Sequence, residues 1–427
     1  MNRHVVGLYF VLIFFRKQKK VLKMINASIN IKLLNFIIIS LIVNYRPEFY
    51  FSVGVVFILY FMLFECNNYD LSRMKFVLYV TYPILLMFFL GVVSGYYYTG
   101  INFEFLKDSF YTLKPVVMIF SGWLLIRFSR DFFGLMEAIF FVLFFHVSLY
   151  LFRFISSGGG LGSAYDSGLI SLSAIIYPLV IFLMPTKNNK NKKFILFFLA
   201  VYLLAIIFSF SRAFIGSNLI ILCAVLGFFV NAYRFIFVGA VFILTVFVFY
   251  FSDNGFGSAF DEVSFYGKLM NSLNEISFGV DVDDPNMLIN WRGFESTQAL
   301  RHINERGLVE NFFGSGLGAS VDIGVQVFMS SDMSFDKLPI LHNGFMQILV
   351  KFGFIGLLAY LIFIYRFYLL SLNIALKNNK LFFLTGLPVV IFYLTFIVTG
   401  VFNKSKIDLI LFFWGACLFM YFDFLDS

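Results

Sequence analysis

Three side chains in this sequence could handle a phosphate-bearing substrate. Arg212 follows Ser211 at the start of one apolar stretch, and His342 precedes Asn343 at the start of another. Arg292 lies in the polar segment between them. An arginine stays charged at any pH and binds phosphate oxygens in pairs, and a histidine exchanges protons near neutral pH. Each residue taken alone also fits a structural role as an interfacial side chain that contacts lipid headgroups or loop carbonyls.

A glycine-rich turn lies between Arg292 and His342. Gly314, Gly316 and Gly318 alternate with a serine and a leucine after a helix-like stretch. The backbone N–H groups of such a turn can bind a phosphate, but a turn of this composition is more often purely structural. Both interpretations stay open on the sequence alone.

Other polar side chains carry weaker signals. Asp281, Asp283 and Asp284 resemble a divalent-metal site, but in so acidic a segment a solvated face is the simpler interpretation. His146 lies in an apolar stretch and is expected to make a local packing hydrogen bond, and His302 would at most support the site from behind. We therefore expect neither a metal nor a cofactor.

The composition indicates that these residues belong to a membrane protein. The 427-residue chain is 60% hydrophobic and only 13% charged, with a mean hydropathy of +0.88. A soluble domain has about 45–50% apolar and about 25% charged residues. Because so much apolar surface cannot be buried in a core of this size, lipid must take the place of water.

Apolar stretches long enough to cross a bilayer recur along the chain. They favour helices over barrel strands, which need only about 9–11 alternating residues. We predict an all-α integral membrane protein with about twelve transmembrane helices and one large loop, divided into an N-terminal bundle (1–252), the loop (253–341) and C-terminal helices (342–427). The predicted spans lie near 31–45, 47–66, 76–98, 110–128, 132–155, 170–185, 194–209, 213–233, 234–252, 343–372, 381–402 and 407–425.

The asymmetry of Lys and Arg across the short loops predicts the orientation. With a cytoplasmic N-terminus, the basic connectors all fall on the cytoplasmic side except the one that contains Lys404 and Lys406. The same count places residues 253–341 outside. That segment has 13 Asp or Glu and five Lys or Arg residues, a net charge of −8, whereas the whole chain is +8. The basic balance therefore indicates anchoring at the inner leaflet and not nucleic-acid binding.

This orientation brings the three candidate residues to one face. Arg212, Arg292 and His342 come from distant parts of the sequence, yet each is predicted at the outer side of the membrane. Two guanidinium groups and an imidazole gathered there suit a ligand with phosphates.

The pattern around these residues resembles the bacterial O-antigen polymerase and O-antigen ligase family of polytopic glycosyltransferases. The ligase signature is a His followed by Asn, Ser or Gln, nine residues, Gly, two residues and a further Gly, Thr or Tyr. His342, Asn343, Gly353 and Gly356 match it in full. The Ser-Arg pair at the start of an earlier helix also fits, as do an arginine and a Gly-rich turn in the large loop. The resemblance covers roughly residues 160–425.

The resemblance implies an inner-membrane, multi-pass enzyme of the metal-independent, inverting GT-C type, active on the periplasmic face. Its donor would be an undecaprenyl-diphosphate-linked oligosaccharide, held by Arg212 and Arg292, with His342 as the catalytic base or hydroxyl-orienting group. Asn343, Gly353, Gly356, Gly314 and Gly316 would be motif or structural residues. Membrane lipids would surround the protein, and the resemblance admits a chain-length regulator protein as a partner.

Three functions compete on the sequence. A polymerase is favoured because the Phe-, Ile-, Asn- and Lys-rich composition is common in surface-polysaccharide gene clusters. A ligase, which transfers the glycan to the lipid A core, fits the histidine motif. A flippase or other transporter of lipid-linked oligosaccharide is disfavoured, because it should carry cations buried in several spans and no large external loop.

Overall fold

The computed structural model describes most of the central and C-terminal chain. Its described segments are 74–129, 131–156, 189–209, 211–231, 290–330, 333–402 and 407–425, with isolated residues elsewhere. The elements are α4 (Met74–Tyr98), α5 (Phe103–Ser129), α6 (Phe132–Ser156), α8 (Asn189–Ser209), α9 (Arg212–Val225), α12 (Trp291–Asn304), α13 (Leu308–Phe313), β1 (Val321–Ser330), β2 (Met333–Leu338), α14 (Gly344–Lys377), η2 (Asn379–Thr385), α15 (Gly386–Val398), η3 (Gly400–Phe402) and α16 (Asp408–Leu425). The predicted spans near 31–45, 47–66, 170–185 and 234–252 lie mostly outside the described residues.

The described part of the chain is largely helical, as expected for an integral membrane protein. Five helical segments in it are long and apolar enough to cross a bilayer: α4, α5, α6, α14 and the η2–α15 segment. Shorter apolar helices α8, α9 and α16 occupy further predicted spans. The chain is therefore a multi-pass membrane protein by helix length and composition, and the total of twelve spans stays a prediction.

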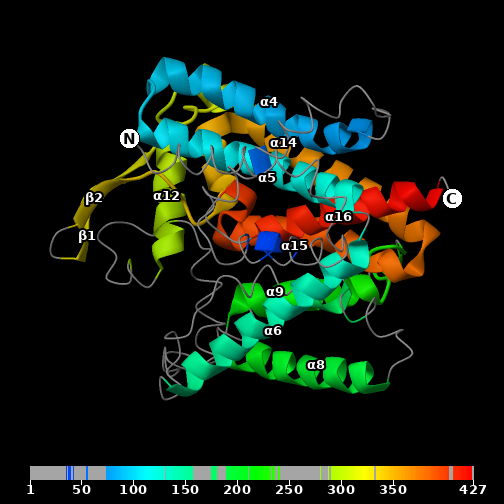
Figure 1. Ribbon diagram of the computed structural model, residues 1–427. Helices are drawn as coiled ribbons and strands as arrows, with labels where there is room; N and C mark the ends of the chain where they lie inside the picture. Colours follow the sequence, from blue (N-terminus) through cyan, green and yellow to red (C-terminus); the bar gives the residue numbers. More distant parts are fainter. Residues whose placement is uncertain are drawn as a thin grey trace, which may run out of the picture.

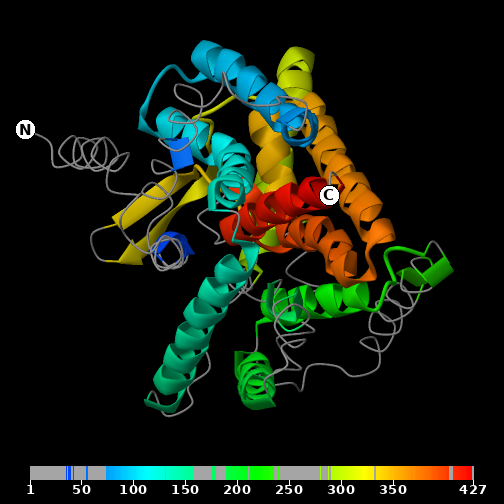
Figure 2. The same ribbon diagram turned by 45° about the vertical axis from the view of Figure 1, so that its right-hand side comes forward.

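The helices form two groups that meet at α9. Helices α4, α5, α14, α15 and α16 lie side by side, and α6, α8 and α9 form a second group beside them (Figures 1 and 2). Helix α9 packs along α15 and so joins the two groups. Helix α5 is the most enclosed of the spanning helices, because α4 packs on one side of it and α16 on another.

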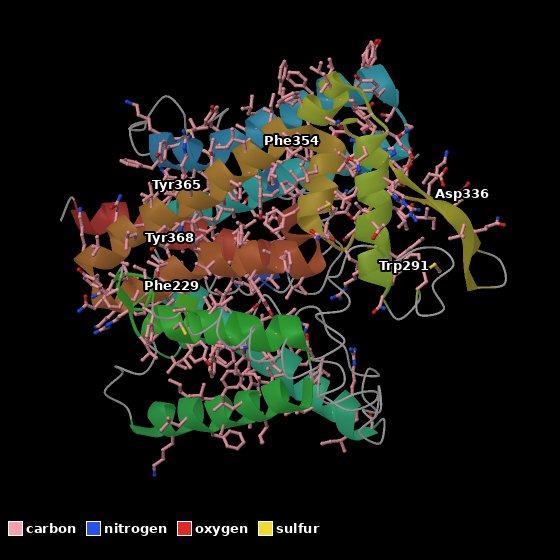
Figure 3. The ribbon with its side chains drawn as sticks, turned by 180° about the vertical axis from the view of Figure 1, so that it is seen from behind. Phe229, Trp291, Asp336, Phe354, Tyr365 and Tyr368 are labelled. Atoms are coloured by element: carbon pink, nitrogen blue, oxygen red, sulfur yellow. The ribbon has the colours of Figure 1, made fainter. Side chains whose placement is uncertain are left out.

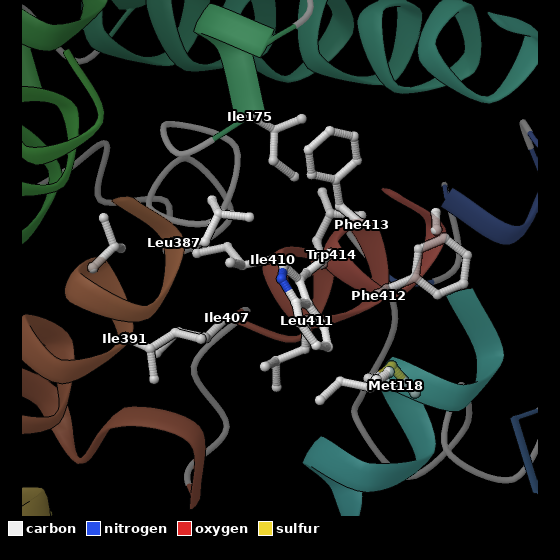
Figure 4. Packing of buried hydrophobic residues seen from close by; sticks show 14 of the residues in the cluster. Met118, Ile175, Leu387, Ile391, Ile407, Ile410, Leu411, Phe412, Phe413 and Trp414 are labelled. Carbon is white, nitrogen blue, oxygen red and sulfur yellow. The ribbon is translucent and has the colours of Figure 1, made fainter. Parts of the chain in front are cut away.

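Small residues bring α5 and α16 into close contact. A Cβ added at Gly122 would collide with the Phe412 carbonyl, and one added at Gly415 would collide with the Ile119 carbonyl. Such contacts are how helices associate in lipid, where apolar surface alone gives no driving force. Figure 4 shows the α16 side chains Ile410 to Trp414 in the core around this contact.

A buried ion pair lies within the same helix contact. Lys114 of α5 is 3.0 Å from the carboxylate of Asp408 at the start of α16, and both side chains are fully buried. A charge inside the membrane is costly unless it is paired. The pair therefore fixes the position of α16 along α5.

Helix α14 is bent sharply at Gly353. This glycine has φ 64° and ψ −165°, which no helix contains. The first section, residues 344–352, lies beside α12, and the second section crosses the bundle (Figure 3, where Phe354 marks the bend). A helical span was predicted here, but the bend was not.

The predicted large loop contains ordered elements packed against one end of the main helix group. Helix α12 lies across the helix ends, and β1 and β2 form an antiparallel hairpin at the same end (Figure 1). Phe294, Ala299 and Ile303 of α12 share a small core with the hairpin and the first section of α14. The prediction of an all-α fold overlooked this two-stranded hairpin.

Candidate active site

The backbone of His342 is held by hydrogen bonds from the residues that flank it and from the end of α15. It lies just before α14, and its backbone carbonyl accepts the N–H of Thr399 at 2.6 Å. The preceding residue, Leu341, accepts the Thr399 hydroxyl at 2.5 Å. The next residue, Asn343, caps α14 by accepting the backbone N–H of Phe345 at 3.0 Å. The backbone around the histidine is thus fixed by α14 itself and by the end of α15.

The side chain of His342 is oriented by Glu295 of α12. The ring Nδ1 lies 2.9 Å from one carboxylate oxygen, and that oxygen also accepts the His342 backbone N–H at 3.0 Å. The other oxygen accepts the indole N–H of Trp291 at 2.5 Å. The Glu295 side chain is only 2% exposed, whereas the His342 side chain is 50% exposed.

This arrangement assigns the tautomer of the imidazole. The ionised Glu295 carboxylate can only accept hydrogen bonds, and it already accepts two N–H groups. The neighbouring Nδ1 of neutral His342 must therefore carry the ring proton. Nε2 then carries the lone pair on a ring that is half exposed. A carboxylate behind Nδ1 also stabilises the imidazolium that forms when Nε2 takes a proton. The contact of Glu295 with His342 therefore has the geometry that general-base chemistry at Nε2 would need.

Arg292 lies in the first turn of α12, three residues before Glu295. Residues three apart on a helix are neighbours on its surface, so the side chain of Arg292 leaves α12 beside that of Glu295, which contacts His342. The arginine is partly exposed. The structure therefore brings Arg292 and His342, which are predicted to act together, to the same corner of the molecule.

Arg212 begins α9, and the structure describes the backbone of this residue. Ser211 caps the helix through its hydroxyl. A Cβ on Gly216 would meet Tyr393, and one on Gly386 would meet Ala224, so α9 runs antiparallel to α15. The start of α9 consequently lies toward the C-terminal end of α15, the end at which Thr399 binds His342.

The glycine-rich turn is a structural clamp in this molecule. Its backbone N–H groups at residues 314–318 all donate within the protein. The acceptors are the carbonyl oxygens of Glu310, Val350, Lys351 and Gly91 and the carboxylate of Asp108, at 2.7–3.0 Å. The geometry therefore rules out the interpretation of the turn as a phosphate cradle in this conformation.

The clamp and the bend of α14 depend on each other. Because Gly353 leaves the helical conformation, the carbonyls of Val350 and Lys351 accept the N–H groups of Ser315 and Gly316. The Lys351 ammonium pairs with the buried carboxylate of Asp108 on α5. These contacts fix the first section of α14, which begins next to His342.

Gly356, the last motif glycine, lies one turn after the bend. A Cβ added there would collide with the side chain of Phe352 across the bend. Both glycines of the predicted motif therefore belong to the bend and not to a ligand contact.

The sequence contains no signal for Glu295. It is one of 13 acidic residues in the segment 253–341 and lies 47 residues before its partner. Only its position four residues after Trp291, on one face of a helix, would have favoured it over the other acids. The aspartates at 281, 283 and 284 lie outside the described residues.

Comparison with known proteins gives one family. Residues 194–361 match the family model described as O-antigen ligase. No curated protein matches the chain. The matched segment runs from α8 to the second section of α14 and contains Arg212, Arg292, Glu295 and His342. This match supports the O-antigen polymerase and ligase family that the sequence resembles.

Proposed function

We propose that the protein is an O-antigen polymerase of the bacterial inner membrane. It transfers an undecaprenyl-diphosphate-linked glycan onto a second lipid-linked repeat unit at the periplasmic face. The family supports glycosyl transfer in general. The single observation that carries the chemistry is the contact of the buried Glu295 carboxylate with Nδ1 of His342 at 2.9 Å.

In the proposed reaction, Nε2 of His342 takes the proton of the acceptor hydroxyl. The acceptor oxygen then bonds to the anomeric carbon of the donor sugar as the bond from that carbon to the diphosphate oxygen breaks. The electron pair leaves with undecaprenyl diphosphate, and a single displacement inverts the anomeric centre. General-base catalysis of this kind contributes about 10²–10⁴ in rate.

The leaving group gains negative charge as the bond breaks. Guanidinium groups placed at the diphosphate stabilise that charge more in the transition state than in the ground state. Arg292 is one helical turn from Glu295, which contacts the base, and Arg212 begins a helix at the same end of the bundle. We assign both to the diphosphate, where they serve in place of a metal ion.

A ligase is the second candidate. The full histidine motif and the description of the matched family favour it. The two activities share the donor and the base, and they differ in the acceptor, which for a ligase is the lipid A core.

The test is a lipopolysaccharide gel of a strain that lacks this gene. A missing polymerase leaves lipopolysaccharide capped with a single repeat unit, because ligation continues. A missing ligase leaves bare core and accumulates lipid-linked polymer. A single-repeat band supports the proposal, bare core supports the ligase, and an unchanged ladder contradicts both.

A further inference from the structure

The glycine-rich turn of the large loop lies deep beside the spanning helix α4. The backbone N–H of Leu317 donates to the carbonyl of Gly91 at 2.9 Å, and a Cβ added at Gly95 would collide with the Leu317 backbone. Gly91 lies 16 residues after Lys75, the exposed lysine at the other end of α4, a distance of about 24 Å at 1.5 Å per residue. The hydrocarbon of a bilayer is about 30 Å thick, and a lysine keeps its ammonium at the headgroups. Gly91 is therefore at a level inside the hydrocarbon.

Three tyrosines at the end of α4 mark the membrane surface independently. Tyr96, Tyr97 and Tyr98 all have exposed side chains. Tyrosine is enriched where a bilayer meets water, because its ring is apolar and its hydroxyl is polar. Gly91 lies about 10 Å below Tyr98 along the helix, on the membrane side of these rings. The tyrosines and the distance from Lys75 thus place the contact with the turn at the same depth.

The turn meets the requirement for non-helical backbone at such a depth. Irregular backbone is tolerated in a membrane only where protein satisfies its polar groups. The N–H groups of residues 314–318 all donate within the protein, and all five residues are buried. Two ion pairs neutralise the charges beside the turn. Arg306 lies 3.4 Å from Glu310, and Lys351 pairs with Asp108. The clamp is therefore suited to surroundings without water.

Helix α13, directly before the turn, exposes apolar side chains that continue the exposed apolar surface of α14. Leu308, Val309 and Phe312 are 79%, 65% and 51% exposed. The ring of Phe312 contacts that of Phe354, which is itself half exposed just after the bend, and Leu358 is exposed one turn further along α14. In Figure 3, Phe354 lies along the helix group and not beyond its end. An apolar surface of this kind, continuous with a spanning helix, suits acyl chains.

We propose that residues 308–318 re-enter the membrane, so that α13 contacts the acyl chains of the leaflet on the side of the large loop. The segment predicted to lie wholly outside is then anchored in lipid between α12 and β1. Because the turn packs on the bend at Gly353, the anchor fixes the level of the first section of α14, and with it His342, relative to the lipid surface. The anchor does not depend on which glycan the protein transfers.

The test measures the depth of α13 by fluorescence quenching of the full chain in phosphatidylcholine nanodiscs. The three native cysteines are replaced by alanine, and one new cysteine, Leu308→Cys or Val309→Cys, carries an NBD fluorophore. The control for lipid is Leu358→Cys on α14, and the control for water is Asp336→Cys on the exposed hairpin (Figure 3). Each label meets lipid brominated on its acyl chains and, in a separate sample, aqueous iodide. Size-exclusion chromatography verifies that each labelled variant is folded.

We expect the labels at 308 and 309 to lose as large a fraction of their fluorescence to brominated lipid as the label at 358, and to resist iodide. The label at 336 should show the reverse. Either α13 position carries the test if the other variant fails to fold. Quenching of the α13 labels by iodide and not by brominated lipid would overturn the proposal. Resistance to both quenchers would also overturn it, because a protein surface, such as a second copy of the chain, would then cover α13.

Discussion

Glu295 binds His342 twice, through the backbone N–H and through the ring Nδ1, although the two residues are 47 positions apart. The double contact fixes both the position and the rotation of the imidazole. It also couples α12 to the start of α14, so this contact forms only when α12 packs at the start of α14. The packing of α12 therefore determines the orientation of the His342 imidazole.

Glu295→Gln should nearly abolish glycan transfer at normal membrane abundance. The amide cannot stabilise an imidazolium, and it turns one acceptor of the site into a donor. We expect a rate loss of about 10² or more. Transfer is measured with purified protein and lipid-linked repeat units, with the exposed Glu305→Gln as control. Equal rates for the two variants would remove Glu295 from the mechanism.

Arg292→Ala should lower the transfer rate by about 10²–10³, because a charge-assisted contact to the leaving diphosphate is lost. Arg292→Lys should restore little, since an ammonium lacks the bidentate fork. Initial rates at saturating substrate measure this loss. The control is Arg301→Ala, which removes an exposed arginine from the same helix. A wild-type rate for Arg292→Ala would show that the arginine is structural.

The sequence allowed the long apolar helices to be predicted, because hydrophobic length is a local property. Helix α4 (Met74–Tyr98) and helix α6 (Phe132–Ser156) agree with the predicted spans to within two residues. Helix α5 starts at Phe103, seven residues before the predicted start at 110. The predicted start was too late because Glu104 and Asp108 resemble loop residues. Lys107 lies 2.6 Å from Glu104 within the same helix. The charge of Asp108 is compensated by Lys351, a distant residue that no local pattern reveals.

The candidate site could be predicted only in part, for the same reason. His342 stands out because an imidazole beside an apolar span has few uses, and Arg292 stands out as an arginine in the large polar segment. Glu295 does not stand out among the acids of the segment, and the bend at Gly353 depends on carbonyls that the distant turn at 314–318 satisfies. Long-range partners of this kind are visible only in the folded chain.

Gly353→Ala should destabilise the protein far more than Gly100→Ala. Both glycines have a positive φ, of 64° and 69°, so alanine strains the backbone at each position by about 1–3 kcal/mol. A Cβ at Gly353 would also collide with the backbone of Phe312 and Gly314, whereas Gly100 faces open space. Heating in detergent followed by size-exclusion chromatography gives the two thermal midpoints. Equal midpoints would mean that the bend tolerates a side chain.

Lys114→Met should sharply reduce membrane abundance, because it leaves the buried Asp408 carboxylate without its 3.0 Å ion-pair partner. Breaking a buried pair costs about 3–5 kcal/mol, whereas replacing both partners is often neutral. We therefore expect the double variant Lys114→Met with Asp408→Leu to recover most of the abundance. Immunoblots of purified membranes measure this, and a double variant no better than the single one would contradict the pairing.

The most direct test of the account is a deletion strain complemented with His342→Ala, examined on a lipopolysaccharide gel with membrane abundance matched to wild type. We predict a single-repeat band, because the variant inserts normally but lacks the base that accepts the acceptor proton. Lipopolysaccharide with bare core would still support His342 as the base, but it would indicate that the enzyme is a ligase. A full-length ladder would contradict the central claim that His342 performs the transfer.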